Sequence, residues 1–143
     1  MIRTVLQSDS RRLAFSFNSI LDSGAEGCIF PSDIGEKVGI READGLPGSS
    51  MGIGGSERLH YHKIKVWTGI EGQAWHFDCM AGFSSQLNRV GWGILGRTEF
   101  FSLFEEVTFD QTRKMLRLKI SGQRPKKKKL GPLESFFGQT THI

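Results

Sequence analysis

The chain has 143 residues, of which 38% are apolar and 24% charged, and its formal net charge is +4. This length fits one domain that buries a core without disulfides, and the composition excludes a disordered chain or a fibre. No segment approaches the roughly 20 apolar residues of a membrane helix, and we see no apolar signal segment at the N-terminus. Cys28 and Cys79 are too few for a disulfide framework, so we expect reduced thiols and a cytoplasmic protein without a membrane partner.

Positive charge is concentrated at the C-terminal end. Residues 111–143 hold nine basic side chains and one acidic side chain, whereas the first 110 residues hold ten basic and 14 acidic ones, so the two parts carry +8 and −4. The run Lys126–Lys129 lies between prolines and glycines, which is typical of a solvated tail. We therefore predict a folded domain over residues 1–122 and a basic, flexible tail over 123–143. Weak, salt-sensitive binding of nucleic acid by the tail is the less favoured interpretation, because the first 110 residues carry a net negative charge.

The predicted elements are mainly strands. Many glycines together with Phe, Val and Ile indicate strands joined by turns rather than a helix bundle. In chain order, alternation and short apolar runs predict strands or apolar segments over residues 1–6, 13–21, 28–30, 59–67, 73–80, 92–96, 107–109 and 114–120.

Two short helices and one glycine-rich hairpin complete this prediction. Ser32 is a candidate N-cap for a short helix that stops at Gly39, and the spacing of apolar residues over 97–104 predicts a second, amphipathic helix. Residues 46–56 are rich in Gly and Ser, which indicates a mobile hairpin tip because glycine leaves the backbone free.

The most informative segment is an apolar strand that leads into Asp22, Ser23 and Gly24. Taken alone, Asp-Ser-Gly is a common turn sequence. It is followed along the chain by the glycine-rich residues 51–55 and then by an apolar run that ends in Gly96 and Arg97. The occurrence of all three segments in this order favours a catalytic site over an ordinary turn.

Together these segments resemble the retropepsin-like aspartic proteases, the retroviral type and its stand-alone microbial relatives. The resemblance covers about residues 13–120, and Ser23 stands where the family more often has Thr. It implies a mainly β fold, a closed, barrel-like retropepsin fold with the two short helices and a flap hairpin. It also implies an aspartic endopeptidase that needs no cofactor and no metal.

The implied chemistry requires two carboxylates. Two carboxylates that share a proton cannot both ionise, so the ionised one takes a proton from water and the neutral one protonates the scissile carbonyl. No other aspartate of this chain lies in an Asp-Ser/Thr-Gly context, and the chain has no internal repeat. The second Asp22 must therefore come from an identical chain, and we expect a homodimer. The family pattern makes residues 1–6 and 116–120 the candidates for its interface.

The resemblance assigns a role to each site residue. Asp22 is the acid and base, Ser23 braces the two loops across the dimer, and Gly24 lets backbone approach the carboxylates. Gly96 and Arg97 support the loop, with Arg97 also a candidate partner of Glu26. The flap would close over an extended peptide that adds as a strand. The positions expected to contact this peptide are Ala25, Glu26, Met51, Gly52, Ile53, Gly54, Gly55, Ile94 and Leu95.

Three alternatives stay open at this point. A metal site near His60 and His62 is conceivable, but strand alternation puts His76 and Cys79 on opposite faces, which disfavours it. Cys28 lacks an oriented histidine and is better explained as a packing residue. The main alternative function is a catalytically idle dimeric module of the same fold that binds peptides or proteins.

Overall fold

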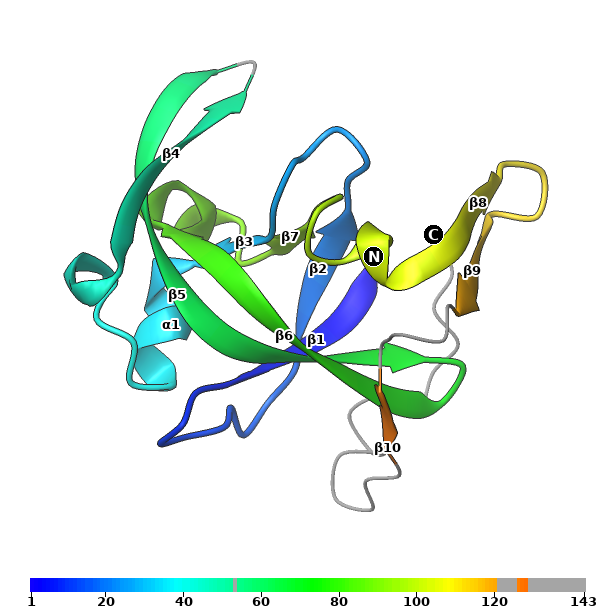
Figure 1. The fold of residues 1–143 in the computed structure, drawn as a ribbon, viewed down its shortest axis with the longest axis horizontal. Helices are drawn as coiled ribbons and strands as arrows, with labels where there is room; N and C mark the ends of the chain where they lie inside the picture. Colours follow the sequence, from blue (N-terminus) through cyan, green and yellow to red (C-terminus); the bar gives the residue numbers. More distant parts are fainter. Residues whose placement is uncertain (53, 121–125, 129–143) are drawn as a thin grey trace.

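The computed structural model describes residues 1–52, 54–120 and 126–128, and it has a mainly β fold with one α-helix (Figure 1). This confirms the predicted fold class at the level of a closed β-barrel. The barrel strands are β1 (Ile2–Gln7), β2 (Phe17–Leu21), β3 (Ile29–Pro31), β5 (Gly55–Ile70), β6 (Gln73–Ser84) and β7 (Gly93–Leu95).

Six strands form a closed ring. They follow one another in the order β6-β3-β7-β2-β1-β5, and β5 then pairs with β6 again over eleven positions, from His60 to Ile70. The N-terminal strand β1 lies inside this ring, because it pairs antiparallel with both β2 and β5. It faces β2 along residues 2–4 and β5 along residues 4–7, so each edge is paired over part of its length.

Short parallel pairings bring distant segments together. β2 pairs parallel with β7, and β3 pairs parallel with β6 and antiparallel with β7. Gly93 permits this close packing, because a Cβ there would lie 2.6 Å from both the Ser19 hydroxyl oxygen and the Phe30 ring. The lack of a side chain at Gly93 therefore allows β7 to lie this close to β2 and β3.

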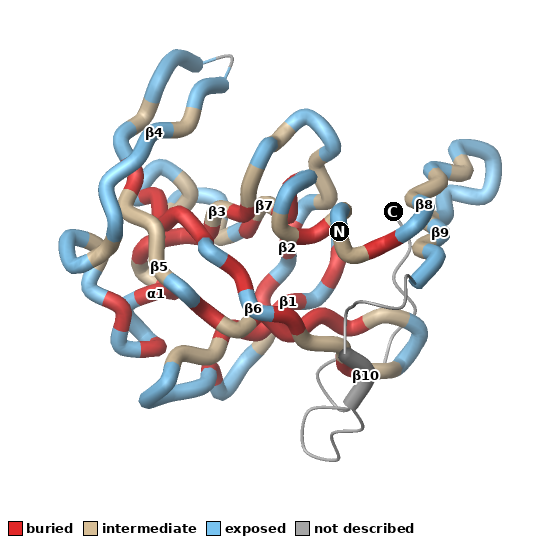
Figure 2. The backbone as a smooth tube through the Cα atoms, viewed as in Figure 1, coloured by how far each residue is buried: buried red, intermediate tan, exposed pale blue. Residues whose placement is uncertain are grey.

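The core inside the ring combines Ile, Val and Leu side chains with several phenylalanines that pack against one another. Phe30 is fully buried and packs edge-on against Phe17 at 5.9 Å between ring centroids, and it also packs against Phe83. Phe100 forms a second aromatic group with Phe77 and with neighbouring rings. Figure 2 shows that the buried backbone follows the barrel, whereas the projecting hairpins are exposed.

Two hairpins lie outside the ring. β4 (Leu46–Gly52) pairs with the first part of β5, from Gly52↔Gly55 to Leu46↔Tyr61, and forms the predicted flap. β8 (Phe104–Asp110) and β9 (Met115–Ile120) form a separate two-stranded sheet. In Figure 1 these two hairpins project from opposite ends of the barrel.

The prediction of two short helices is half right. The helix α1 (Ser32–Lys37) is present, and Gly39 follows it with φ of +81°, a conformation that glycine favours. Ser32 is its first residue and not its N-cap; that position is Pro31, and the Ser32 hydroxyl instead contacts the Asn88 amide.

The second predicted helix, over 97–104, is wrong. This segment consists of turns and one 3₁₀ turn, η3 (Phe101–Leu103). The amides of Phe100 and Phe101 both donate to the Gly96 carbonyl, which closes a tight turn directly after β7. There are two other 3₁₀ turns among the described residues. The turn η1 (Glu42–Asp44) precedes the flap, and the turn η2 (Ser85–Arg89) follows β6.

The C-terminal basic segment contributes one short strand. The backbone of β10 (Lys126–Lys128) pairs antiparallel with residues 74–76 of β6. The expectation of a flexible tail over 123–143 otherwise lies mostly outside the described residues. Within the described part of the chain, no helix is long and apolar enough to span a membrane.

Candidate active site

Asp22 lies in the loop that follows β2, at the mouth of a cleft. Its carboxylate oxygen Oδ1 accepts a hydrogen bond from the Gly24 amide at 2.8 Å, and its carbonyl accepts from the Ala25 amide. The loop therefore turns back on itself and orients the carboxylate. Asp22 is half-buried, whereas Ser23 and Gly24 are exposed.

The segment after β7 supports this loop through main-chain contacts. The amides of Arg97 and Thr98 donate to the carbonyls of Ala25 and Glu26 at 3.0 and 2.7 Å. Gly96 is required for this approach, because a Cβ there would collide with the Gly27 carbonyl. The two segments that the sequence singled out thus lie against each other.

The cleft has a volume of about 1010 Å³, at the upper end of what ligand pockets usually enclose. The Asp22 loop, Ile94 and residues 49–52 of the flap strand β4 all line it. Its further lining includes Tyr61 and Met80 from the central strands. A channel of this size between a loop and a hairpin suits an extended chain better than a compact small molecule.

The charge of the cleft is negative overall. Asp22, Glu26 and Glu99 line it, with Arg97 as the one cation among the lining residues that the structure describes. Burial, and next the nearby charge of Glu26, raise the pKa of the Tyr61 phenol. The raised pKa of Tyr61 therefore reflects both the burial of its ring and the negative charge of this part of the cleft.

Most of the predicted site residues meet at this cleft. Those that line it are Asp22, Gly24, Ala25, Glu26, Met51, Gly52, Ile94 and Arg97. Gly54 and Gly55 lie further along the flap and line a smaller adjoining cavity. Ile53, predicted at the flap tip, lies outside the described residues.

Two assignments differ from the expected picture. Leu95 is expected both behind the loop and in the substrate wall; its side chain is fully buried in the core, which fits the position behind the loop and not contact with a peptide. Arg97 is exposed and contacts the loop through its main chain; among the described ion pairs none joins it to Glu26. Ser23 is exposed and is not among the residues that line the cleft, and its predicted role across a dimer stays a prediction.

Sequence reasoning missed several lining residues. Tyr61 and Met80 project from long central strands, and Ser49, Ser50, Thr98 and Glu99 flank segments that were recognised. Ser49 and Ser50 belong to the Gly- and Ser-rich stretch, so their position in the flap was a usable signal. Tyr61 and Met80 gave none, because their position depends on which strands pair.

His60, His62 and the two cysteines are the side chains considered as metal ligands or as a nucleophile. His62 Nε2 lies 3.0 Å from the Glu42 carbonyl oxygen, and His60 Nδ1 lies 4.0 Å from the Glu42 carboxylate. Cys28 and Cys79 are both buried and free. In the described part of the chain, no group of three or more such side chains is placed to hold a metal ion.

Comparison with known proteins adds no relative. No protein-family model, curated protein or solved structure matches this chain.

Proposed function

We propose that this chain is one half of a homodimeric aspartic endopeptidase of the retropepsin-like kind. The observation that carries the proposal is the position of Asp22 on a loop that opens into the cleft that the flap strand β4 also lines. The parallel pairing of β2 with β7 and the main-chain contacts of the loop supply the rigid support that a catalytic carboxylate needs.

The chemistry follows from bringing two such loops together. One ionised Asp22 takes a proton from a water molecule, whose oxygen attacks the scissile carbonyl carbon. The neutral Asp22 of the second chain gives its proton to the carbonyl oxygen, which forms a tetrahedral diol. The first Asp22 then passes the proton that it took from water to the amine nitrogen. As the C–N bond breaks, one hydroxyl of the diol returns its proton to the second Asp22. The two carboxylates act as one coupled acid–base unit.

The dimer interface is part of the proposal. Of the two segments expected there, β1 is a barrel strand that pairs with β2 over residues 2–4 and with β5 over residues 4–7, so only part of each edge remains unpaired by the described strands. β9 pairs only with β8 among the described strands, and the β8–β9 hairpin exposes Phe109, Met115 and Ile120. This hairpin is the surface that we assign to the second copy.

The decisive experiment compares the unmodified protein with Asp22→Asn on a peptide library at acidic to neutral pH. We expect cleavage by the former only, with both proteins dimeric by mass. Asp9→Asn is the matched control, because Asp9 is exposed and lines neither cavity. Peptide binding without cleavage by the unmodified protein would favour the idle binding module of the same fold.

A mixing experiment tests the requirement for two Asp22 residues. An equal amount of Asp22→Asn chain is added to a fixed amount of unmodified chain and allowed to exchange. Random pairing should lower the total activity to about half, because mixed dimers carry one carboxylate. Unchanged activity would show that each chain works alone and would refute the dimeric mechanism.

A further inference from the structure

A smaller cavity adjoins the cleft beneath the flap. Its volume is about 220 Å³, below the usual range for a whole ligand but suited to one side chain. It shares Ile29, Ser50, Gly52 and Ile94 with the large cleft, so it is a side pocket of the same channel. The residues that belong to it alone include Glu57, Ser84, Gln86 and Leu87.

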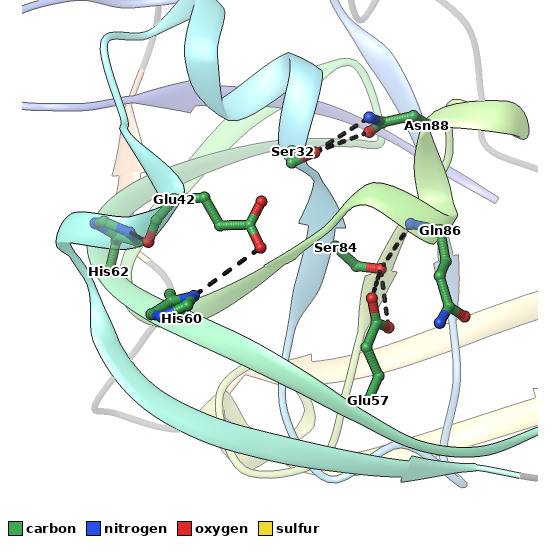
Figure 3. A network of polar contacts seen from close by, with 8 residues as sticks. All are labelled: Ser32, Glu42, Glu57, His60, His62, Ser84, Gln86 and Asn88. Carbon is green, nitrogen blue, oxygen red and sulfur yellow. Dashed lines mark hydrogen bonds and ion pairs between the residues drawn. The ribbon is translucent and has the colours of Figure 1, made fainter.

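Glu57 is held in place at this pocket by a buried hydroxyl. Ser84 Oγ lies 2.8 and 2.9 Å from the two carboxylate oxygens of Glu57, and Ser84 is 1% exposed. The main-chain N–H of Gln86 donates to the same Ser84 oxygen at 3.1 Å, and this second contact holds the hydroxyl in place (Figure 3). The carboxylate is therefore oriented before any ligand arrives.

The hydrogen-bonding capacity of Glu57 is largely unused. A hydroxyl has one hydrogen to donate, whereas a carboxylate offers about four acceptor sites. Within the described residues, no lysine or arginine forms an ion pair with Glu57. The neighbouring Arg58 is exposed and lines neither cavity. A half-buried carboxylate without a counter-ion in a side-chain-sized pocket is suited to a cation.

We propose that Glu57 makes this pocket a subsite for a lysine or arginine side chain of the bound peptide. The inference rests on the proposed function, since it concerns what the same channel selects. The apolar stem of the side chain would lie along Ile29, Leu87 and Ile94, and its charged end would reach Glu57.

The test uses peptides that differ only in Arg, Lys, Gln or Glu at one position, scanned along the sequence. For the unmodified protein we expect kcat/KM to be about tenfold higher with Arg or Lys than with Gln at one position. Glu57→Gln should remove this ratio, and Glu57→Lys should reverse it in favour of Glu. Arg58→Gln is the matched control and should keep the ratio.

The ratio of kcat/KM between charged and neutral peptides separates recognition of the peptide side chain from a structural role of the Glu57–Ser84 contact. A loss of activity in Glu57→Gln with the same ratio between peptides would mean that Glu57 only ties the flap to the barrel. Equal rates for Arg, Lys and Gln peptides at every position would overturn the subsite, while Asp22-dependent cleavage would leave the proposed function intact.

A binding measurement keeps the subsite testable without catalysis. The same peptides, carrying a fluorescent label, are bound to Asp22→Asn and to Asp22→Asn combined with Glu57→Gln. A charge preference in the first protein that disappears in the second supports the subsite even when no peptide is cleaved. Equal affinity for charged and neutral peptides in the first protein refutes it.

Discussion

The main-chain N–H of Asp22 donates to the carbonyl oxygen of Leu95 at 3.1 Å, and this bond extends the parallel pairing of β2 and β7 into the loop. Leu95 is fully buried, so its carbonyl is a fixed point of the barrel. The position of the carboxylate is thus set by residues far away in the sequence. It follows that changes near Leu95 should alter the site without touching the cleft.

Gly96→Ala tests this relationship. The added methyl group would meet the carbonyls of Ala25 and Gly27, so the loop or β7 must shift. We expect the free energy of unfolding to fall by about 2 kcal/mol, as in other overpacked sites. Denaturant unfolding measures this. Gly54→Ala is the control for stability, because its added methyl group meets no atom within 4 Å; equal losses in both variants would contradict the argument.

Glu26→Gln should lower the pKa of Tyr61. Burial is the larger cause of the raised value and the Glu26 charge is the second, so removing that charge reverses only part of the shift. Tyr61 is the single tyrosine of the chain, and an ultraviolet titration of the phenolate therefore reports on it alone. Glu71→Gln serves as the control, since Glu71 lies in the distant β5–β6 turn and lines neither cavity. An unchanged midpoint in Glu26→Gln would place Glu26 too far from the ring.

The thiol of Cys79 should resist alkylation in the folded protein. A hydrogen bond with Cys28, and next burial, raise its pKa well above the ordinary value, so the reactive thiolate is scarce. Because the folded form holds the proton more tightly, this contribution to stability is complete below about pH 8.5 and declines as the pH rises further. Mass spectrometry after iodoacetamide treatment should show modification only in denaturant.

An exposed cysteine provides the comparison for that experiment. Val90 is 52% exposed, so Val90→Cys should be alkylated rapidly under native conditions. Modification of Cys79 at the same rate as this introduced thiol would contradict the prediction. It would show that the native core opens readily or that Cys28 and Cys79 do not form a hydrogen bond.

The turn of the β8–β9 hairpin should loosen at low pH. Asp110 accepts hydrogen bonds from the Arg113 amide at 2.9 Å and from its guanidinium at 3.0 Å, and these lower the pKa of Asp110, with Arg117 adding to the effect. The stabilisation is therefore present above the ordinary value of about 3.9 and is lost as the pH falls through the lower folded value.

An NMR titration of the Arg113 amide measures this change. We expect its resonance to move with the protonation of Asp110, at a pH below that of an ordinary aspartate. Asp110→Asn should remove the titration, while Glu105→Gln, in an exposed pair with Lys119, should retain it. A midpoint at the ordinary value would contradict the role of the arginine contacts.

Local sequence patterns were sufficient for most of the strands but not for their exact bounds. Alternation predicted a strand over 13–21, whereas only Phe17–Leu21 is extended in the sheet. The apolar spacing at Phe100, Phe101 and Phe104 fits a helix, yet these rings pack as a compact aromatic group around a tight turn after Gly96. Periodicity describes which residues are buried and does not decide between these conformations.

The residues of the candidate site also fall into those that local sequence patterns indicate and those that depend on strand pairing. Asp22, Ile94 and the flap glycines were recognised because they lie in short segments whose order is itself informative. Glu57 and Ser84 were missed, because each is an ordinary polar residue until β5 and the end of β6 bring them into contact. Leu95 was expected both behind the loop and in the cleft wall, and only the first position fits its burial, because an apolar residue beside a cleft and one behind it look alike in sequence.

The six-strand ring is complete without β4. The β5–β6 ladder begins at His60, so residues 55–59 have a strand partner only in β4. The main-chain hydrogen bonds that close the barrel therefore do not extend to this end of β5 or to its partner β4. Side-chain contacts at the base of the hairpin, such as Glu57 with Ser84, join it to the barrel, so single substitutions there should change how firmly the hairpin is held.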